Sequence, residues 1–217
     1  MRTFQGEYTT EGAEIHCHRA YEFGSLWLFP PITPTHLSKT LNKYFEITEY
    51  EMSEIMQGRG KPGAFTPAPN LKEFLYTLKE NNVKIGLVTS GLYQKAWPEI
   101  LNAFQTLGMG DPVDFYDAII TAGTAIRKGQ SGTLGEIEAK PHPWLYAETA
   151  MALGVTDKSR IIGIEDSAAG VMSIRLSGFA ALGVAGGNLG QSGMLPFLYD
   201  KRENDGLLSL LPTILGK

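Results

Sequence analysis

From residue 70 onward, amphipathic helical patterns alternate with short apolar runs, and this alternation constrains the fold more than any other feature of the sequence. The apolar runs predict four strands, at residues 83–88, 117–121, 160–164 and 179–184. The intervening patterns predict helices after Asn70, from Pro98 to near Gly108, at 143–153, at 168–176, and at 207–215 with an interruption at Pro212. Alternation of this kind is typical of right-handed βαβ crossovers. The predicted fold class is therefore α/β, a three-layer, doubly wound and mostly parallel sheet with helices on both faces.

The composition changes near residue 60, which predicts two domains. Residues 1–62 are rich in helix formers and aromatic residues, and short helices are expected at 36–45 and 49–56. Residues 63–217 contain the α/β pattern. The stretch 58–69 carries three glycines and three prolines, which is typical of a linker. We therefore expect a small helical cap at 1–62, a core at 63–217, and a hinge between them.

Charge and cysteine content narrow the possible partners and compartment. The 217 residues carry a net charge of −4 with no basic run, which argues against nucleic acid as a partner. Cys17 is the only cysteine, so an internal disulfide is impossible and a reducing compartment is expected. No apolar stretch is long enough to span a membrane, and the first residues lack the apolar core of a signal peptide. We expect a cytoplasmic protein that binds a small molecule or another protein, while the sequence indicates no particular oligomeric state.

Polar residues follow the predicted strands at the places where a parallel sheet binds its ligands. In doubly wound sheets the ligand lies beyond the carboxyl ends of the strands. Thr89-Ser90-Gly91 follows the first predicted strand, and Glu165-Asp166 follows the third. Lys140 lies between them in sequence, at the entry to a predicted helix. These residues are the candidates for a shared site.

Glu165 and Asp166 are adjacent carboxylates preceded by apolar residues. Mg²⁺ prefers oxygen ligands and often keeps several waters, so one or two carboxylates are enough to bind it. The pair is therefore a candidate magnesium site. The alternative is that the pair caps the helix that starts at Ala168, because acidic residues stabilise helix N-termini.

The other two candidates offer groups that bind phosphate. Thr89-Ser90-Gly91 supplies hydroxyls and backbone N–H groups at a predicted strand-to-helix turn, where a phosphate could bind. Lys140 could neutralise charge on a phosphoryl group. The alternatives are a simple turn with a serine cap, and a solvated loop lysine before Pro141.

Taken together, these segments resemble the haloacid dehalogenase-like (HAD) superfamily, in its phosphoglycolate phosphatase and β-phosphoglucomutase branch. IGLVTSG (85–91) looks like the second motif of the family, and KPHPWLYAETAMALGV (140–155) is similar to the third. IIGIEDSAAGVMSIRLSGFAALGV (161–184) looks like the fourth and is the most specific match, with Ser177 in place of the usual alanine. The resemblance covers about residues 66–190.

The resemblance implies a HAD-like core and a role for each candidate. Asp166 would bind Mg²⁺, with Glu165 as a second ligand, directly or through water. Thr89 would hydrogen-bond the transferring phosphoryl group, assisted by the Ser90 and Gly91 backbone. Lys140 would contact the phosphoryl oxygens and the nucleophile. The implied function is a Mg²⁺-dependent phosphatase that acts on a small phosphorylated metabolite through an aspartyl-phosphate intermediate.

The chain departs from the family at the first motif, an apolar strand ending Asp-x-Asp-Gly that supplies the nucleophile. No Asp-x-Asp occurs in the 217 residues. In the family this strand is central, between those that here carry Thr89 and Asp166. We therefore expect the natural protein to start further upstream, and the present chain to be inactive. The alternatives are a non-catalytic binding module of the same fold and a phosphomutase. A dehalogenase is disfavoured, because those relatives need no metal.

Overall fold

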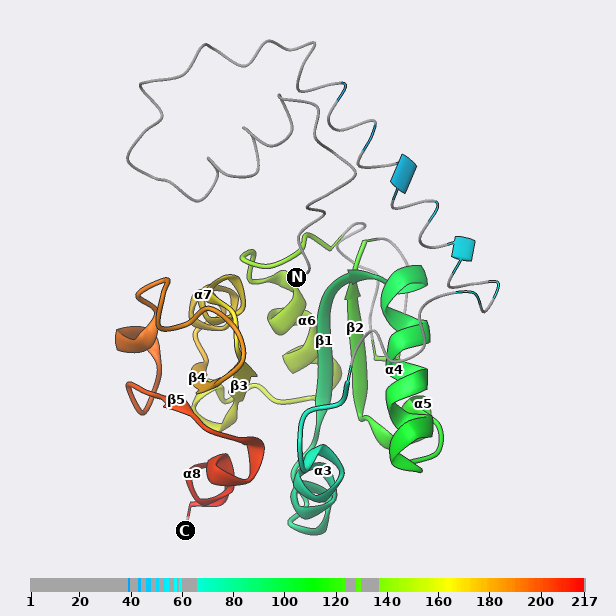
Figure 1. Ribbon diagram of the computed structural model, residues 1–217. Helices are drawn as coiled ribbons and strands as arrows, with labels where there is room; N and C mark the ends of the chain where they lie inside the picture. Colours follow the sequence, from blue (N-terminus) through cyan, green and yellow to red (C-terminus); the bar gives the residue numbers. More distant parts are fainter. Residues whose placement is uncertain are drawn as a thin grey trace. The chain divides into compact units, whose positions relative to one another are not determined.

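The computed structural model describes residues 66–123, 128–129 and 137–216, together with scattered positions between residues 39 and 59 (Figure 1). The chain divides into two units, residues 1–60 and 61–217. In the first unit the described positions Lys39, Lys43, Ser53 and Glu54 are helical. Most of the predicted helices at 36–45 and 49–56, and most of the predicted linker, lie outside the described residues. The cap and its hinge therefore remain predictions.

The second unit contains the alternating helices and strands. In chain order these are α3 (Leu71–Glu80), β1 (Gly86–Leu92), α4 (Tyr93–Leu107), α5 (Pro112–Phe115), β2 (Ala118–Ala122), α6 (Trp144–Ala152), η2 (Lys158–Arg160), β3 (Ile162–Glu165), α7 (Ala168–Leu176), β4 (Ala180–Val184), η3 (Leu195–Phe197), β5 (Glu203–Asn204), η4 (Leu207–Leu210) and α8 (Leu211–Leu215). In the described part of the chain, no helix has the length and apolar character needed to cross a membrane.

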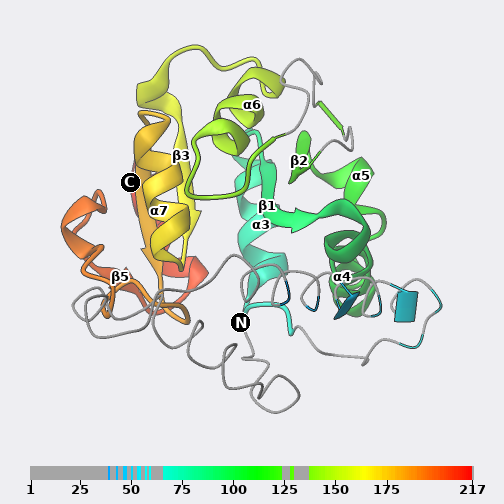
Figure 2. The same cartoon turned by 90° about the horizontal axis from the view of Figure 1, so that it is seen from above.

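All the strand pairs are parallel, and they form two separate sheets. β1 pairs with β2, with Val88 opposite Ile120. β3 pairs with β4, and β4 pairs with the short β5. Figures 1 and 2 show β1 and β2 on one side of the unit and β3 with α7 on the other. The predicted α/β fold with parallel strands is confirmed.

Helices cover both faces of the strands because successive strand residues point in opposite directions. In β2, Ile119 packs in a core cluster with α3, while Ile120 packs in another cluster with Leu145 of α6. In β4, Leu182 belongs to the α3 cluster and Ala181 to a cluster with α6 and α7. The strands therefore form the middle of three layers.

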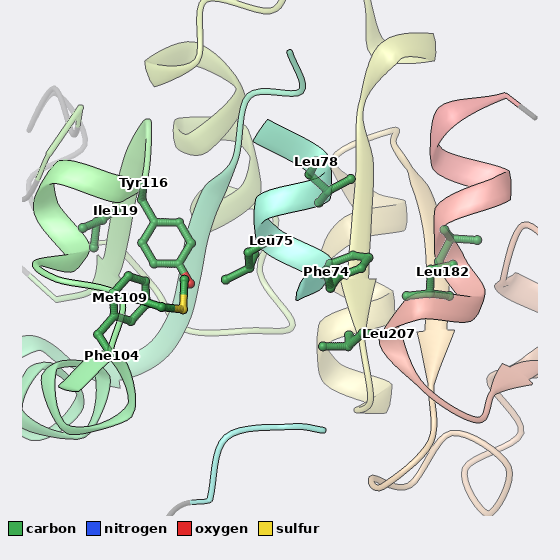
Figure 3. Close-up of a cluster of buried hydrophobic side chains, with 10 residues drawn as sticks. Phe74, Leu75, Leu78, Phe104, Met109, Tyr116, Ile119, Leu182 and Leu207 are labelled. Carbon is green, nitrogen blue, oxygen red and sulfur yellow. The ribbon is translucent and has the colours of Figure 1, made fainter. Parts of the chain in front are cut away.

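One core cluster joins the two sheets. It is formed by buried residues from α3, α4, β2, β4 and η4 and from the turns around α5: Phe74, Leu75, Leu78, Phe104, Met109, Tyr116, Ile119, Leu182, Leu207 and Leu210. Figure 3 shows the three α3 side chains lying between the β2 side and the β4 side of this cluster. The i, i+1, i+4 spacing of Phe74, Leu75 and Leu78 places them on one face of the helix. We refer to this set as the α3 cluster.

The first strand begins later than the sequence predicts. The backbone N–H of Val83 donates to Leu78, and Asn82 has φ +57, so this segment still closes α3. β1 then extends through Thr89-Ser90-Gly91, with an irregular register between Thr89 and Leu92. These three residues thus lie within the strand, and the predicted strand-to-helix turn is displaced toward α4.

Two prolines are placed differently from the prediction. α4 begins at Tyr93, so Pro98 lies inside the helix and not at its start. An interior proline removes one helix hydrogen bond, and the packing of Trp97 and Leu107 against the α3 cluster offsets that loss. Pro212 lies in the first turn of α8, where its missing N–H has no helical partner to lose, so it begins the α-helix instead of interrupting it.

Candidate functional site at the carboxyl ends of β1 and β3

The candidate site lies where two strands from different sheets end. β1 pairs with β2 on one side, β3 pairs with β4 on one side, and no described strand pairs with the second edge of either. The loop that leads into α6 connects their carboxyl ends through Lys140. The site is therefore built from the strand ends of two parallel sheets.

Lys140 makes both of these connections. Its backbone N–H donates to Ser90 Oγ at 3.1 Å, at the end of β1. Its ammonium group forms an ion pair with Glu165 Oε1, at the end of β3. Only 13% of the Lys140 side chain and 8% of the Glu165 side chain are exposed, so water screens the pair weakly. The structure therefore brings Ser90, Lys140 and Glu165 together.

The Glu165 carboxylate accepts from three donors. Besides Lys140, Tyr146 Oη donates to Oε1 at 2.5 Å and Ser167 Oγ donates to Oε2 at 3.0 Å. The Glu165 carboxylate fits against α7 only because residue 170 is glycine, since a Cβ at that position would be 2.0 Å from the carboxylate carbon. Glu165 is thus a buried carboxylate with hydrogen-bond partners, which a buried charged group requires.

Tyr146 remains a hydrogen-bond donor over the ordinary pH range. Burial raises the pKa of its phenol, and the negative charge of Glu165, the hydrogen bond to Glu165 and the charge of Asp166 raise that pKa further. A phenol beside a carboxylate is held in its protonated form, because ionisation would place two negative charges together.

Asp166 differs from its neighbour because its side chain is exposed. Its backbone is held in place by the loop after β4. Asn188 donates its N–H to the Asp166 carbonyl at 3.0 Å and accepts from the Ala168 N–H through its side chain at 2.8 Å. A Cβ at Gly187 would be 2.0 Å from that carbonyl oxygen, so the approach requires glycine. The carboxylate is therefore presented to solvent from a fixed backbone.

Ser167 is the side chain that caps α7. It occupies the N-cap position, and its hydroxyl accepts from the Gly170 N–H at 3.2 Å. The alternative considered for Glu165 and Asp166 was that they serve as this cap. The capping role belongs to Ser167, and Glu165 instead contacts Lys140.

Thr89 makes a local contact. Its Oγ1 accepts from the Gly91 N–H at 3.0 Å, which accompanies the irregular end of β1. Ser90, the next residue, is exposed and contacts Lys140. Thr89 and Gly91 therefore lie at the end of β1 and contact each other, and Ser90 is the residue of this segment that contacts Lys140.

In the ranges that the structure describes, no three His, Cys, Asp or Glu side chains form a group able to hold a metal ion. The metal-capable groups at this edge are the two carboxylates Glu165 and Asp166. Two carboxylates fit Mg²⁺, which can complete its shell with water and substrate oxygens. The donor chemistry of the pair fits this ion, with Asp166 the accessible member.

Sequence reasoning missed Tyr146 and Asn188. Tyr146 lies six residues after Lys140, at the third position of α6, and could have been found by asking which first-turn side chain of that helix faces Lys140. Asn188 stands in the loop after β4, between Gly187 and Gly190. Its role depends on the return of this loop to β3, which no local pattern indicates.

A family model for the haloacid dehalogenase-like hydrolases matches residues 33–178, well over half of the chain. This match, together with the α/β core and its parallel strands, defines the class of protein. The chain belongs to the haloacid dehalogenase-like hydrolases. Among curated protein sequences, none matches it.

Solved structures with a similar fold come from several organisms. A HAD hydrolase of family IA, variant 3, from Entamoeba histolytica is 17% identical, with a TM-score of 0.58, and the match covers 83% of this chain and 75% of that one. CbbY from Rhodobacter sphaeroides, in complex with phosphate, is 15% identical, with a TM-score of 0.52, covering 84% and 68%. A β-phosphoglucomutase from Clostridium difficile is 24% identical, with a TM-score of 0.48, covering 90% and 71%.

Proposed function

We propose that this protein is a Mg²⁺-dependent phosphatase that acts on a small phosphorylated metabolite at the carboxyl ends of β1 and β3. The observation that carries the proposal is the position of Lys140, which contacts Ser90 on one strand and Glu165 on the other. Lys140 is a cation between a hydroxyl group and a carboxylate. This arrangement suits the binding of a negatively charged phosphate ester together with a metal ion. Membership of the hydrolase family supports the same reaction class.

The residues of the site divide into two sets. Thr89, Ser90 and Gly91 would contact the phosphoryl oxygens through hydroxyl and backbone groups, and Lys140 would neutralise their charge. Asp166 would bind Mg²⁺, with Glu165 as a second ligand, directly or through water. Bound Mg²⁺ would supply further charge neutralisation. Because Glu165 already accepts from three donors, a water-mediated contact requires the smaller rearrangement.

The nucleophile would come from a strand between β1 and β3. The described parts of both sheets have an edge without a strand partner there, and unpaired backbone groups are costly when buried. An aspartate at the carboxyl end of such a strand would lie near Lys140. Its carboxylate oxygen would attack phosphorus as the ester P–O bond breaks, and water would then hydrolyse the aspartyl phosphate.

A second candidate function is a non-catalytic binding module. The observation that favours it is the absence of any Asp-x-Asp motif from the 217 residues. Such a module would keep the phosphate and metal contacts and lack turnover. Both candidates therefore predict ligand binding, and they differ in whether a nucleophile completes the site.

The test measures binding and turnover separately. We expect isothermal titration calorimetry to show that inorganic phosphate binds to the 217-residue chain more tightly with Mg²⁺ than without it. Asp166→Asn should remove the Mg²⁺ effect, whereas Asp114→Asn, which removes an exposed carboxylate on α5, should keep it. Mg²⁺-independent phosphate binding by the wild type would overturn the metal assignment.

Turnover is tested with p-nitrophenyl phosphate. We expect no Mg²⁺-dependent hydrolysis by the 217-residue chain, because its sequence contains no Asp-x-Asp motif. Measurable hydrolysis that Asp166→Asn abolishes would show that another group in the chain attacks phosphorus. In a form of the protein that carries the Asp-x-Asp strand, the same substitution should abolish activity and leave the fold intact.

A further inference from the structure

We infer that Tyr146 is a positioning residue that holds the Lys140–Glu165 ion pair in place at the carboxyl ends of β1 and β3. The value of this role to the reaction rests on the proposed function, because a fixed Lys140 serves phosphoryl binding. The contacts themselves are independent of that function. They involve the hydroxyl group and the aromatic ring of the tyrosine side chain.

The hydroxyl group contacts the acidic member of the pair. Tyr146 Oη donates to Glu165 Oε1 at 2.5 Å, and this is the same oxygen that Lys140 contacts. Ser167 holds the other oxygen at 3.0 Å. With a donor on each oxygen, the carboxylate cannot rotate without losing a charge-assisted hydrogen bond, and such bonds are the stronger ones. The carboxylate therefore presents a fixed oxygen to Lys140.

The ring contacts the basic member. Lys140 Nζ lies 5.5 Å from the centre of the Tyr146 ring, within the range of a cation–π interaction. Lys140 is thus attracted by the carboxylate and by the ring face of the residue that orients the carboxylate. One side chain consequently restricts both partners of the ion pair.

Packing makes Tyr146 rigid enough for this role. The side chain is 8% exposed and belongs to a buried cluster with Ala150 of α6 and Val171 and Ile174 of α7. α6 begins at Trp144, so Tyr146 is in its first turn, directly after the loop that carries Lys140. A side chain fixed by the core on one side can hold a polar group accurately on the other.

Substitution separates the hydroxyl from the ring. Tyr146→Phe keeps the ring and the packing and removes the 2.5 Å hydrogen bond, whereas Tyr146→Leu removes both contacts. Tyr116→Phe is the matched control, because Tyr116 is also buried but lies in the α3 cluster away from Glu165. All variants are made in the 217-residue chain, and thermal unfolding checks that each is folded.

The readout is the ammonium signal of Lys140 in ¹H–¹⁵N NMR spectra, assigned by its loss in Lys140→Met. We expect exchange of the Lys140 ammonium protons with water to be about tenfold faster in Tyr146→Phe, the scale of one hydrogen bond to a charged group. Exchange should be faster still in Tyr146→Leu and unchanged in Tyr116→Phe. A folded Tyr146→Phe variant with the wild-type exchange rate would overturn the inference.

Phosphate titration of the same variants separates this inference from the proposed function. If the wild type binds phosphate, Tyr146→Phe should bind it more weakly by up to about tenfold. Faster Lys140 exchange in Tyr146→Phe, with no phosphate binding by the wild type, would support the positioning role and overturn the proposed function. An unchanged Lys140 exchange rate in Tyr146→Phe, with phosphate binding by the wild type, would overturn the positioning role and support the proposed function.

Discussion

The ammonium group of Lys140, in the loop before α6, forms a part-buried ion pair with Glu165, which lies 25 positions later in the sequence at the end of β3. We predict that Glu165→Gln lowers the free energy of unfolding by about 3 kcal/mol, because it leaves a mostly buried ammonium without its counter-charge. Lys140→Met should also lower the free energy of unfolding, because it leaves the Glu165 carboxylate without its counter-charge. Urea unfolding at neutral pH measures both changes.

The double variant is the control for this pair. Once one charge is gone, removing the other should cost little, so the double variant should lose less than the sum of the single variants by at least about 1 kcal/mol. Simple additivity of the two losses would show that the pair contributes nothing as a pair.

Gly170 provides the space for the Glu165 carboxylate. Alanine in a helix is ordinarily more stable than glycine by about 1 kcal/mol. Here the added Cβ would be 2.0 Å from the carboxylate carbon, so Gly170→Ala should instead destabilise by about 1–3 kcal/mol. Gly206→Ala is the control, since no atom lies within 4 Å of its Cβ and φ is −177, an extended value open to any residue. Its unfolding midpoint in urea should stay near that of the wild type, and a stabilised Gly170→Ala would contradict the packing around Glu165.

Asp117 connects α3 to the residue that precedes β1, and its carboxylate makes the free energy of unfolding depend on pH. Its carboxylate accepts from Lys79 Nζ and from the Ile85 N–H, both at 2.7 Å. Burial acts to raise the pKa of Asp117, but these hydrogen bonds and the charges of Lys79 and Lys128 together lower it below the ordinary value. A lowered pKa stabilises the fold above the unfolded-state pKa of about 3.9, and the contribution is lost as pH falls through the folded-state pKa.

Asp117→Asn should therefore be less stable than the wild type at pH 7, and the difference should shrink as the pH falls below about 4. Urea unfolding at a series of pH values measures this change, with Asp114→Asn as the control for loss of an exposed charge. A stability difference that stays constant down to pH 2 would contradict the role of the Asp117 carboxylate.

Phe74 lies in the α3 cluster, which joins the two sheets (Figure 3). It is 3% exposed, so Phe74→Ala should lower the free energy of unfolding by about 3–5 kcal/mol, whereas the exposed neighbour Glu73→Ala should change it by less than about 0.5 kcal/mol. Because the cluster contains Ile119 of β2 and Leu182 of β4, amide exchange should accelerate in both strands. Faster exchange in only one of them would show that the sheets unfold independently.

Local sequence signals predicted most elements of the second unit. α7 was predicted at 168–176, and the structure places it at Ala168–Leu176, because Ser167 caps its start and Gly178, with φ +84, follows its end. The second, third and fourth predicted strands agree with β2, β3 and β4 to within two residues at each end. The prediction that Pro98 starts a helix was wrong. Pro98 lies inside α4, where packing of the helix offsets the lost hydrogen bond, and local sequence rules do not include this packing.

The sequence by itself determined the order of helices and strands, the family, and the residue types gathered at the strand ends. Each of these follows from periodicity or from motifs read within a few residues of one another. Only the tertiary structure decided that Lys140 pairs with Glu165, that Tyr146 and Ser167 hold that carboxylate, and that the strands form two sheets. The Lys140 and Tyr146 contacts join residues 25 and 19 positions away from Glu165, and they form only when α6 and α7 pack against the strands and bury their side chains together.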